Sequence, residues 1–321
     1  MEALARGIEV FHFNRGQSTP AGPAASAGLP PGVETIHGDI RDTEAAAKLL
    51  APHHFDCVVD WIGFTPEQVR SDIELFRDRT GQFVFISSAS IYHKPPRHYV
   101  ITESTPAFNP YWEYSQNKIA CEMTLKRAYV TERFPVTIVR PSHTYSDGWF
   151  PTTFGSRDFT VPQRMLDGKP VVVHGDGTSL WTLTHSDDFA RAFVGLLGNP
   201  AAVGEAFHIT SEEALTWDQI HRVIGNALGV EPRIVHVTSD LISRLSPQHG
   251  PGLVGDKAHS LVFDNTKIKR WVPGFVASIP FHEGMRRSVA WVNEDPERKN
   301  VDPELDKLID DVVAAVDPQV R

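Results

Sequence analysis

The chain has 321 residues, of which 41% are hydrophobic, and its formal net charge is −9. It is long enough to bury a substantial core in two lobes. Basic residues are neither in excess nor clustered, which argues against binding to a nucleic-acid backbone, and no apolar run approaches the ~18 residues of a membrane span. Two cysteines and a start without a basic-then-apolar leader favour a cytoplasmic protein. We expect a small-molecule substrate as partner, no nucleic acid and no membrane, and leave a homodimer open.

Patterns typical of strands and helices alternate along most of the chain. The expected strands are 9–13, 34–37, 57–61, 83–87, 136–140, 171–174 and 206–209. The expected helices are 43–50, 66–76, 111–133, 185–197 and 216–227. This rhythm predicts an α/β fold with a doubly wound, Rossmann-like parallel sheet.

Three polar residues at the ends of these elements are candidates for catalysis. Tyr114 and Lys118 are four residues apart on an expected helix, so they lie on one face. Ser88 follows an apolar strand, at the edge where open α/β sheets place their ligands. A free phenol titrates near ~10, so we expect the cation of Lys118 to lower the pKa of Tyr114. Together these residues indicate hydride transfer, although a Y-x-x-x-K pair alone also arises by chance.

Further motifs follow the order of a known family. They are GDIRD at 38–42, FISSASIY at 85–92, YSQNK at 114–118, VRP at 139–141, HSDD at 185–188 and FHIT at 207–210. Over most of its length the chain resembles the extended short-chain dehydrogenase/reductase family, also called the NAD-dependent epimerase/dehydratase family. The resemblance implies hydride transfer between a nicotinamide and a carbinol carbon of a sugar-like or other small hydroxylated substrate. It also implies that Ser88, Tyr114 and Lys118 are the catalytic residues.

The start of the chain departs from that family. Dinucleotide-binding folds open with a strand and a glycine-rich loop that holds the pyrophosphate at a helix N-terminus. Residues 1–7 instead predict the last turns of a helix closed by Gly7, followed by the second strand of the fold. We therefore expect about 15 to 25 residues to be missing relative to the family pattern, and the strand at 8–13 to lack one neighbour. A misplaced start or a truncation is favoured over a purposeful form without the loop.

Cofactor contacts are expected along the strand ends of the sheet. The residues assigned to them are Asn14, Arg15, Asp39, Ile40, Trp61, Ile62, Gly63, Tyr114, Lys118 and Pro141. The neutral Asn14 followed by Arg15 favours NADP over NAD, because an arginine can accept a 2′-phosphate. An arginine in a turn also faces solvent by default, so NAD stays open.

Substrate contacts are assigned to Ser88, Ser90, His143 and Trp181. The resemblance places an arginine for the diphosphate of a nucleotide sugar where this chain has Trp181, so that clamp would be lost. His143 either contacts substrate or is satisfied by its backbone neighbours. The sequence has no H-E-x-x-H, C-x-x-C or G-x-S-x-G motif, so we expect neither a metal site nor a hydrolase.

We expect residues 1–148 to form an N-terminally incomplete dinucleotide-binding domain to which 183–210 return. Residues 149–182 and 211–294 would form a smaller C-terminal substrate lobe, and 295–321 a tail with an amphipathic helix at 302–316. The Pro-, Gly- and Ala-rich segment 18–31 predicts a surface loop. Residues 250–255 match G-x-G-x-x-G without a preceding strand, which predicts a mobile loop and no phosphate site.

A rival function follows from the same departure at the start. Relatives of this fold that have lost cofactor chemistry serve as RNA-binding or regulatory modules, and the absent glycine loop favours such a role. The acidic net charge disfavours RNA.

Overall fold

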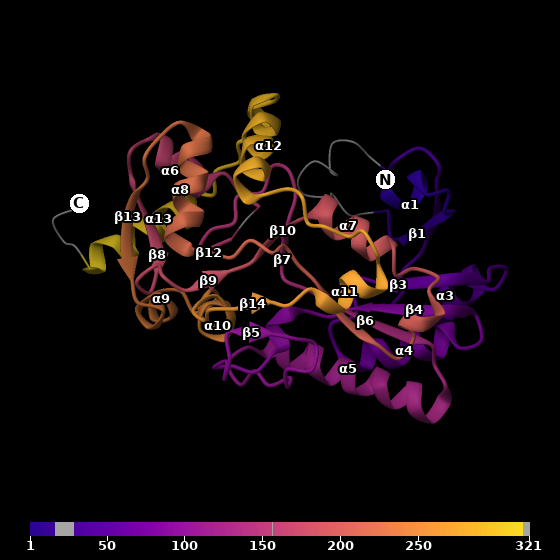
Figure 1. Ribbon diagram of the computed structural model, residues 1–321. Helices are drawn as coiled ribbons and strands as arrows, with labels where there is room; N and C mark the ends of the chain where they lie inside the picture. Colours follow the sequence, from indigo (N-terminus) through magenta and orange to yellow (C-terminus); the bar gives the residue numbers. More distant parts are fainter. Residues whose placement is uncertain (17–28, 156, 317–321) are drawn as a thin grey trace.

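The computed structural model describes residues 1–16, 29–155 and 157–316 (Figure 1). Most of the predicted loop 18–31 lies outside the described residues. Within the described ranges, no helix combines the length and apolar character needed to cross a membrane.

The central sheet is parallel and contains four strands. Its order is β11 (Ala206–Ile209), β6 (Val136–Pro141), β4 (Thr80–Ile86) and β3 (Phe55–Asp60). The strands β1 (Val10–Asn14) and β2 (Val33–His37) form a separate parallel pair. Among the described strands, β1 pairs with β2 alone, and none joins β1 to β3.

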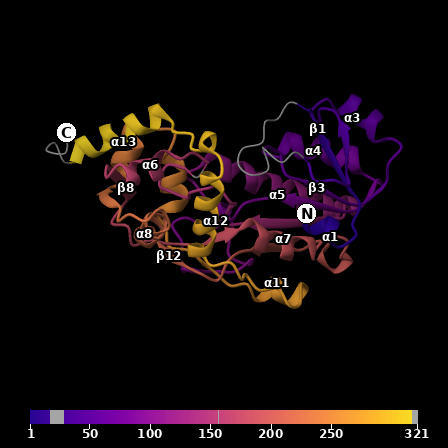
Figure 2. The ribbon, with the colours of Figure 1, turned by 90° about the horizontal axis from the view of Figure 1, so that it is seen from above.

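The two faces of the sheet are covered by different helices, as Figure 2 shows for α3 and α4 on one side and α7 and α11 on the other. Alternate residues of β4 explain this arrangement, because neighbouring side chains of a strand point to opposite faces. Phe83 and Phe85 pack in the core with α3 (Thr43–Leu50), α4 (Pro66–Phe76) and α5 (Glu113–Glu132). Val84 and Ile86 pack in the core with α7 (Ser186–Val194) and α11 (Thr266–Trp271). The predicted parallel, doubly wound sheet is thus confirmed.

A third core gathers around the pair β8 (Pro170–His174) and β13 (Arg233–Val237). Trp217 and Phe281 are buried in it. The helices that contribute to it are α6 (Thr160–Leu166), α8 (Trp217–Leu228), α9 (Ser239–Leu245), α12 (Phe281–Asn293) and α13 (Pro303–Val316). Figure 1 shows this group on the side of the molecule opposite β1 and α3. The terminal helix therefore packs on its own chain.

Short strand pairs connect the sheet to this group. They are β7 (His143–Tyr145) with β10 (Leu183–His185), β9 (Leu180–Trp181) with β12 (Leu215–Thr216), and β5 (Val100–Ile101) with β14 (Val262–Phe263). The remaining short elements are α1 (Glu2–Ala5), η1 (Ala89–Ile91), η2 (Pro200–Ala202) and η4 (Pro296–Arg298).

The segment that matches the glycine fingerprint differs from the prediction of a mobile loop. It forms helical turns, α10 (Gly250–Gly252) and the π-helical η3 (Leu253–Lys257). Gly255 is required here by packing, because a Cβ at this position would lie 2.9 Å from the Cβ of Trp112. Glycine at this position lets the backbone of η3 approach Trp112 closely. The segment follows helix α9, whereas a phosphate-binding loop follows a strand.

Candidate active site

A chain of serine hydroxyls starts where β4 ends. Ser88 precedes the turn η1 and caps it by accepting a hydrogen bond from the amide of Ser90. The Oγ atoms of Ser88 and Ser90 are 2.9 Å apart, and those of Ser90 and Ser115 are 2.7 Å apart. The predicted Ser88 is therefore held by its neighbours at the carboxyl edge of the sheet, next to helix α5.

Tyr114 lies in the first turn of α5, beside Ser88. Its ring packs against Trp112, with centroids 4.9 Å apart. Burial raises the pKa of the Tyr114 phenol above its ordinary 10.0, and the nearby Asp256 carboxylate adds to this, while a hydrogen bond with Ser88 acts in the opposite direction. The phenol is therefore protonated at neutral pH.

Lys118 is one turn further along α5, but its ammonium faces two backbone carbonyls. Nζ donates to Gly63 O at 2.8 Å and to Ile86 O at 2.7 Å, and the side chain is buried. Burial lowers the pKa of Lys118 to about 8, against the attraction of Asp60. The expectation that Lys118 lowers the pKa of Tyr114 is wrong for this structure, because burial dominates at the phenol.

The turn after β3 lies against Lys118, because its residue Gly63 accepts a hydrogen bond from the ammonium. Asp60 Oδ1 accepts hydrogen bonds from the amides of Ile62 at 2.9 Å and of Gly63 at 2.8 Å. A side chain at Gly63 would collide with the Asp60 carboxylate, so this turn requires glycine. Trp61 packs against Phe193 with centroids 5.3 Å apart, yet it remains 52% exposed.

Four of the predicted cofactor residues lie at the end of β1 or shortly after β1 and β2. The side chain of Asn14 bonds to its own turn, since its Oδ1 accepts a hydrogen bond from the amide of Gly16 at 2.7 Å. Arg15 is exposed and lies 3.9 Å from the carboxylate of Asp39. Ile40 packs on the core beside α3. Arg15 is thus free to turn toward a ligand at a cost limited to one exposed ion pair.

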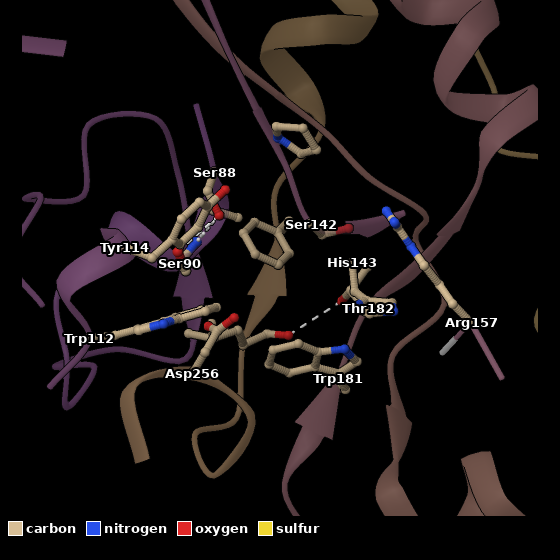
Figure 3. Close-up of a pocket in the computed structure, with 14 residues that line it drawn as sticks. Ser88, Ser90, Trp112, Tyr114, Ser142, His143, Arg157, Trp181, Thr182 and Asp256 are labelled. Atoms are coloured by element: carbon tan, nitrogen blue, oxygen red, sulfur yellow. Dashed lines mark hydrogen bonds between the residues drawn. The ribbon is translucent and has the colours of Figure 1, made fainter. Parts of the chain in front are cut away.

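A cavity of about 440 Å³ opens beside Ser88 and Tyr114 (Figure 3). The side chains that line it come from both sides of the molecule: Ser88, Ala89, Ser90, Trp112, Tyr114, Pro141, Ser142, His143, Arg157, Trp181, Thr182, Asp256, Leu261 and Phe263. All four residues predicted to contact substrate are among them. Lys118 and the predicted cofactor residues other than Tyr114 and Pro141 are not among them.

His143 and Trp181, which both line the cavity, each have a buried side-chain nitrogen without a hydrogen-bond partner among the described residues. Neither His143 Nε2 nor Trp181 Nε1 has a hydrogen-bond partner among the described residues. Burial, with Lys257 and Arg157 nearby, lowers the pKa of His143 to about 3, so the imidazole is neutral. The reading in which His143 is fully satisfied by its neighbours is therefore wrong for Nε2.

Sequence reasoning missed Trp112, Arg157, Thr182, Asp256 and Phe263. Trp112 stands two residues before Tyr114 and could have been suspected on that ground. Asp256 carries no such signal, because it follows the misleading glycine segment, far along the chain from Tyr114. Asn109 joins the two regions by donating to Ser90 O at 2.8 Å and to Gly255 O at 2.7 Å.

Comparison with known proteins places this geometry in a family. The model of the NAD dependent epimerase/dehydratase family matches residues 1–210. The chain belongs to this family.

Burial raises the pKa of Cys57 to about 11 and of Cys121 to about 12, so neither thiol suggests a different, nucleophilic chemistry.

Two curated relatives and one solved structure illustrate the range of the family. The chain is 28% identical over 203 residues (63% of its length) to 2'-dehydrokanamycin reductase of Streptomyces kanamyceticus. It is 29% identical over 240 residues (73% of its length) to the chloroplast stem-loop binding protein of 41 kDa b of Arabidopsis thaliana. These matches span 56% and 60% of the relatives' own lengths. A dTDP-glucose 4,6-dehydratase from Bacillus anthracis, solved in complex with NAD, shares the fold with a TM-score of 0.72 at 19% identity, over 92% of each chain.

Proposed function

We propose that this protein is an NAD(P)-dependent enzyme of the oxidoreductase, epimerase or dehydratase type, acting on a carbinol carbon of a small hydroxylated substrate. The observation that carries the proposal is the position of the Ser88 and Tyr114 hydroxyls on one wall of the cavity. When bound, the nicotinamide supplies the hydride acceptor or donor for that carbon. Membership of the family and the NAD complex of a protein with the same fold support this reading.

The residues of the chain would handle the proton and the substrate oxygen. Ser88, held by the hydroxyl of Ser90, positions the oxygen of the reacting carbon. The protonated phenol of Tyr114 donates a proton to that oxygen as a carbonyl is reduced, and accepts it in the reverse direction. The raised pKa of Tyr114 makes the donor role the better suited one near neutral pH.

The described residues fit the two ends of a dinucleotide better than its middle. Arg15 and Asp39 are exposed near the expected adenosine end, and Ser88 and Tyr114 line the cavity at the reacting end. Between them, no glycine-rich turn connects a strand to a helix in the described ranges. The Lys118 ammonium is engaged by the carbonyls of Gly63 and Ile86. The pyrophosphate therefore has no backbone cradle of the usual kind here.

We expect the 321-residue chain to bind NADH and NADPH with dissociation constants no tighter than about 1 mM. Contacts at the two ends remain, while the central phosphates lack amide donors. Isothermal titration calorimetry with each dinucleotide measures this directly. Micromolar binding of both would contradict the expectation and show that another segment holds the phosphates.

Replacing Arg15 by Ala is expected to weaken NADPH binding by about fivefold, the worth of one exposed ion pair, and to leave NADH binding nearly unchanged. Only NADPH offers a 2′-phosphate to the guanidinium. Arg70, exposed and paired with Glu67 on α4, gives the matched control Arg70→Ala, which removes the same charge elsewhere. Equal effects of Arg15→Ala on both dinucleotides would overturn the preference for NADP.

The proposed function is tested with substrates suggested by the relatives. At millimolar NADPH, the protein is incubated with 2'-dehydrokanamycin, and at millimolar NAD with dTDP-glucose, and products are identified by mass spectrometry. Reduction or dehydration above the level without protein supports the proposal. Absence of hydride transfer with either substrate, at a cofactor concentration well above the dissociation constant measured by calorimetry, would count against it.

A second candidate is a binding module without hydride-transfer activity. It is favoured by the engagement of Lys118 and by the likeness to a protein described as a stem-loop binding protein. The net charge of −9 disfavours an RNA backbone as partner. Gel-shift assays with a structured RNA at low and moderate salt separate the two: salt-sensitive retention without enzymatic turnover would favour the binding module.

A further inference from the structure

The cavity beside Tyr114 has aromatic walls on two sides. Trp112 and Trp181 both line it, and Figure 3 shows the Asp256 carboxylate between the two indoles in this view. Trp181 is only 5% exposed, so its position is fixed by its surroundings. Indole faces provide broad apolar surfaces against which the flat face of a ring can pack.

The polar groups of the cavity are mostly uncharged hydrogen-bonding groups. Hydroxyls of Ser88, Ser142 and Thr182 line it, and a hydroxyl both donates and accepts. The buried indole N–H of Trp181 has no acceptor among the described residues, and one nitrogen of the neutral His143 is also unpaired. A lining of hydroxyls favours a ligand that supplies several donors and acceptors around its rim.

Asp256 is the one carboxylate among the described lining residues, and its neighbours hold it in place. Its Oδ1 lies 3.1 Å from Nζ of Lys94, whose side chain is completely buried, while the Asp256 side chain keeps 16% exposure. Gly255 brings the segment against Trp112, and Asn109 binds the Gly255 carbonyl. The carboxylate is therefore held facing the cavity with lone pairs to spare.

Cations that could hold phosphate are occupied or peripheral. Lys257 donates to the carbonyls of Thr152 and Thr153, and Lys94 is paired with Asp256. Arg157 is the single lysine or arginine among the described lining residues, and its guanidinium lies 4.6 Å from the ring centroid of Trp149. A diphosphate in this cavity would meet the Asp256 carboxylate with one exposed cation to offset the repulsion.

We propose, building on the proposed function, that the substrate is a polyhydroxylated ring without phosphate. Its apolar face packs on Trp112 and touches the small exposed part of Trp181, and its hydroxyls donate to Asp256 and form hydrogen bonds with the serine and threonine hydroxyls. Asp256 then determines specificity by accepting a ligand hydroxyl and disfavouring a diphosphate.

Saturation-transfer NMR tests this without cofactor or turnover. The probes are the methyl glycosides of glucose, galactose and mannose, compared with UDP-glucose. We expect saturation transfer to at least one methyl glycoside, and none to the uridine protons of UDP-glucose. The inference is overturned if no glycoside binds, or if saturation transfer reaches the uridine protons of UDP-glucose and the methyl glycosides compete with it.

Variants of the cavity assign the binding to these residues. Asp256→Asn alone leaves Lys94 buried without its partner and can unfold the protein, so the double variant Lys94→Met/Asp256→Asn removes both charges. We expect it to weaken glycoside binding by about tenfold. Trp112→Leu, which unpairs no charge, should reduce saturation transfer at least threefold. Asp240→Asn on α9, an exposed carboxylate paired with Arg244, is the matched control.

The outcomes separate this inference from the proposed function. Glycoside binding without hydride transfer would retain the substrate class and remove the proposed enzyme activity. Turnover of dTDP-glucose without glycoside binding would retain the enzyme and overturn the substrate class. Unchanged glycoside binding in both folded cavity variants would show that the glycosides bind elsewhere and would also overturn the inference.

Discussion

Replacing Tyr114 by Phe is expected to reduce hydride-transfer turnover by about a hundredfold or more, the usual worth of general acid–base catalysis. The change removes only the phenolic oxygen, and the ring that packs on Trp112 stays in place. Dinucleotide affinity should therefore change little. Turnover is measured with whichever substrate the wild-type protein converts, and affinity by calorimetry on the same preparations.

The pH dependence gives a second readout of the same residue. Because burial raises the pKa of Tyr114 above 10.0, the proton-donating form persists through neutral pH. The rate of carbonyl reduction should hold from neutral pH until the pH approaches 10, as far as this group controls it. Tyr129→Phe, on the exposed side of the same helix, is the control and should retain turnover. If Tyr114→Phe kept more than about a tenth of the wild-type rate, the proton would have to come from another group.

Local signals in the sequence were sufficient where they were strong. The start of α4 follows from Thr65 and Gln68, which form a capping box with Pro66 in the first turn. The start of α3 follows from the N-cap Asp42, whose side chain accepts the amide of Ala45. Strand β4 was recognisable because a buried parallel strand is apolar on both faces.

Contacts between distant segments could not be predicted from such signals. Strands β9, β12 and β14 have two residues each, so they exist only through their pairing partners. The spacing of Tyr114 and Lys118 places both on one face of α5. It does not reveal that the carbonyls of Gly63 and Ile86 take the ammonium. Asp256 reaches the site through contacts between distant segments, among them the bonds from Asn109 to the backbones of Ser90 and Gly255.

Replacing Arg140 by Met is expected to lower the free energy of unfolding by about 3 to 5 kcal/mol, because it leaves the buried carboxylate of Glu122 without its buried partner and with only the exposed Lys126 beside it. Arg140 donates to both oxygens of Glu122, at 2.8 and 2.7 Å. The two side chains are 4% and 2% exposed. Arg140 also donates to Tyr92 Oη and to the carbonyl of Glu103. The pair therefore links α5 and β6 to the segment between β4 and α5. Urea denaturation followed by circular dichroism measures the loss.

Lys126 provides the matched control, since it also pairs with Glu122 but is 53% exposed. Lys126→Met removes the same charge and should cost less than about 1 kcal/mol, as an exposed ion pair does. A similar loss in both variants would mean that net charge, and not burial, sets the effect.

The difference between wild type and Arg140→Met should depend on pH. Burial favours the neutral form of Glu122, but the hydrogen bonds and charge of Arg140 outweigh it and lower the pKa below the ordinary 4.5. A lowered pKa in the folded state stabilises the protein above pH 4.5, and this contribution is lost as the pH falls through the folded-state pKa. Without Arg140, burial instead favours a protonated Glu122, so acid relieves the penalty in the variant. The gap in unfolding free energy should therefore narrow as the pH is lowered from 7 toward 4, over the range in which both proteins remain folded. A constant gap would show that Arg140 acts through packing alone.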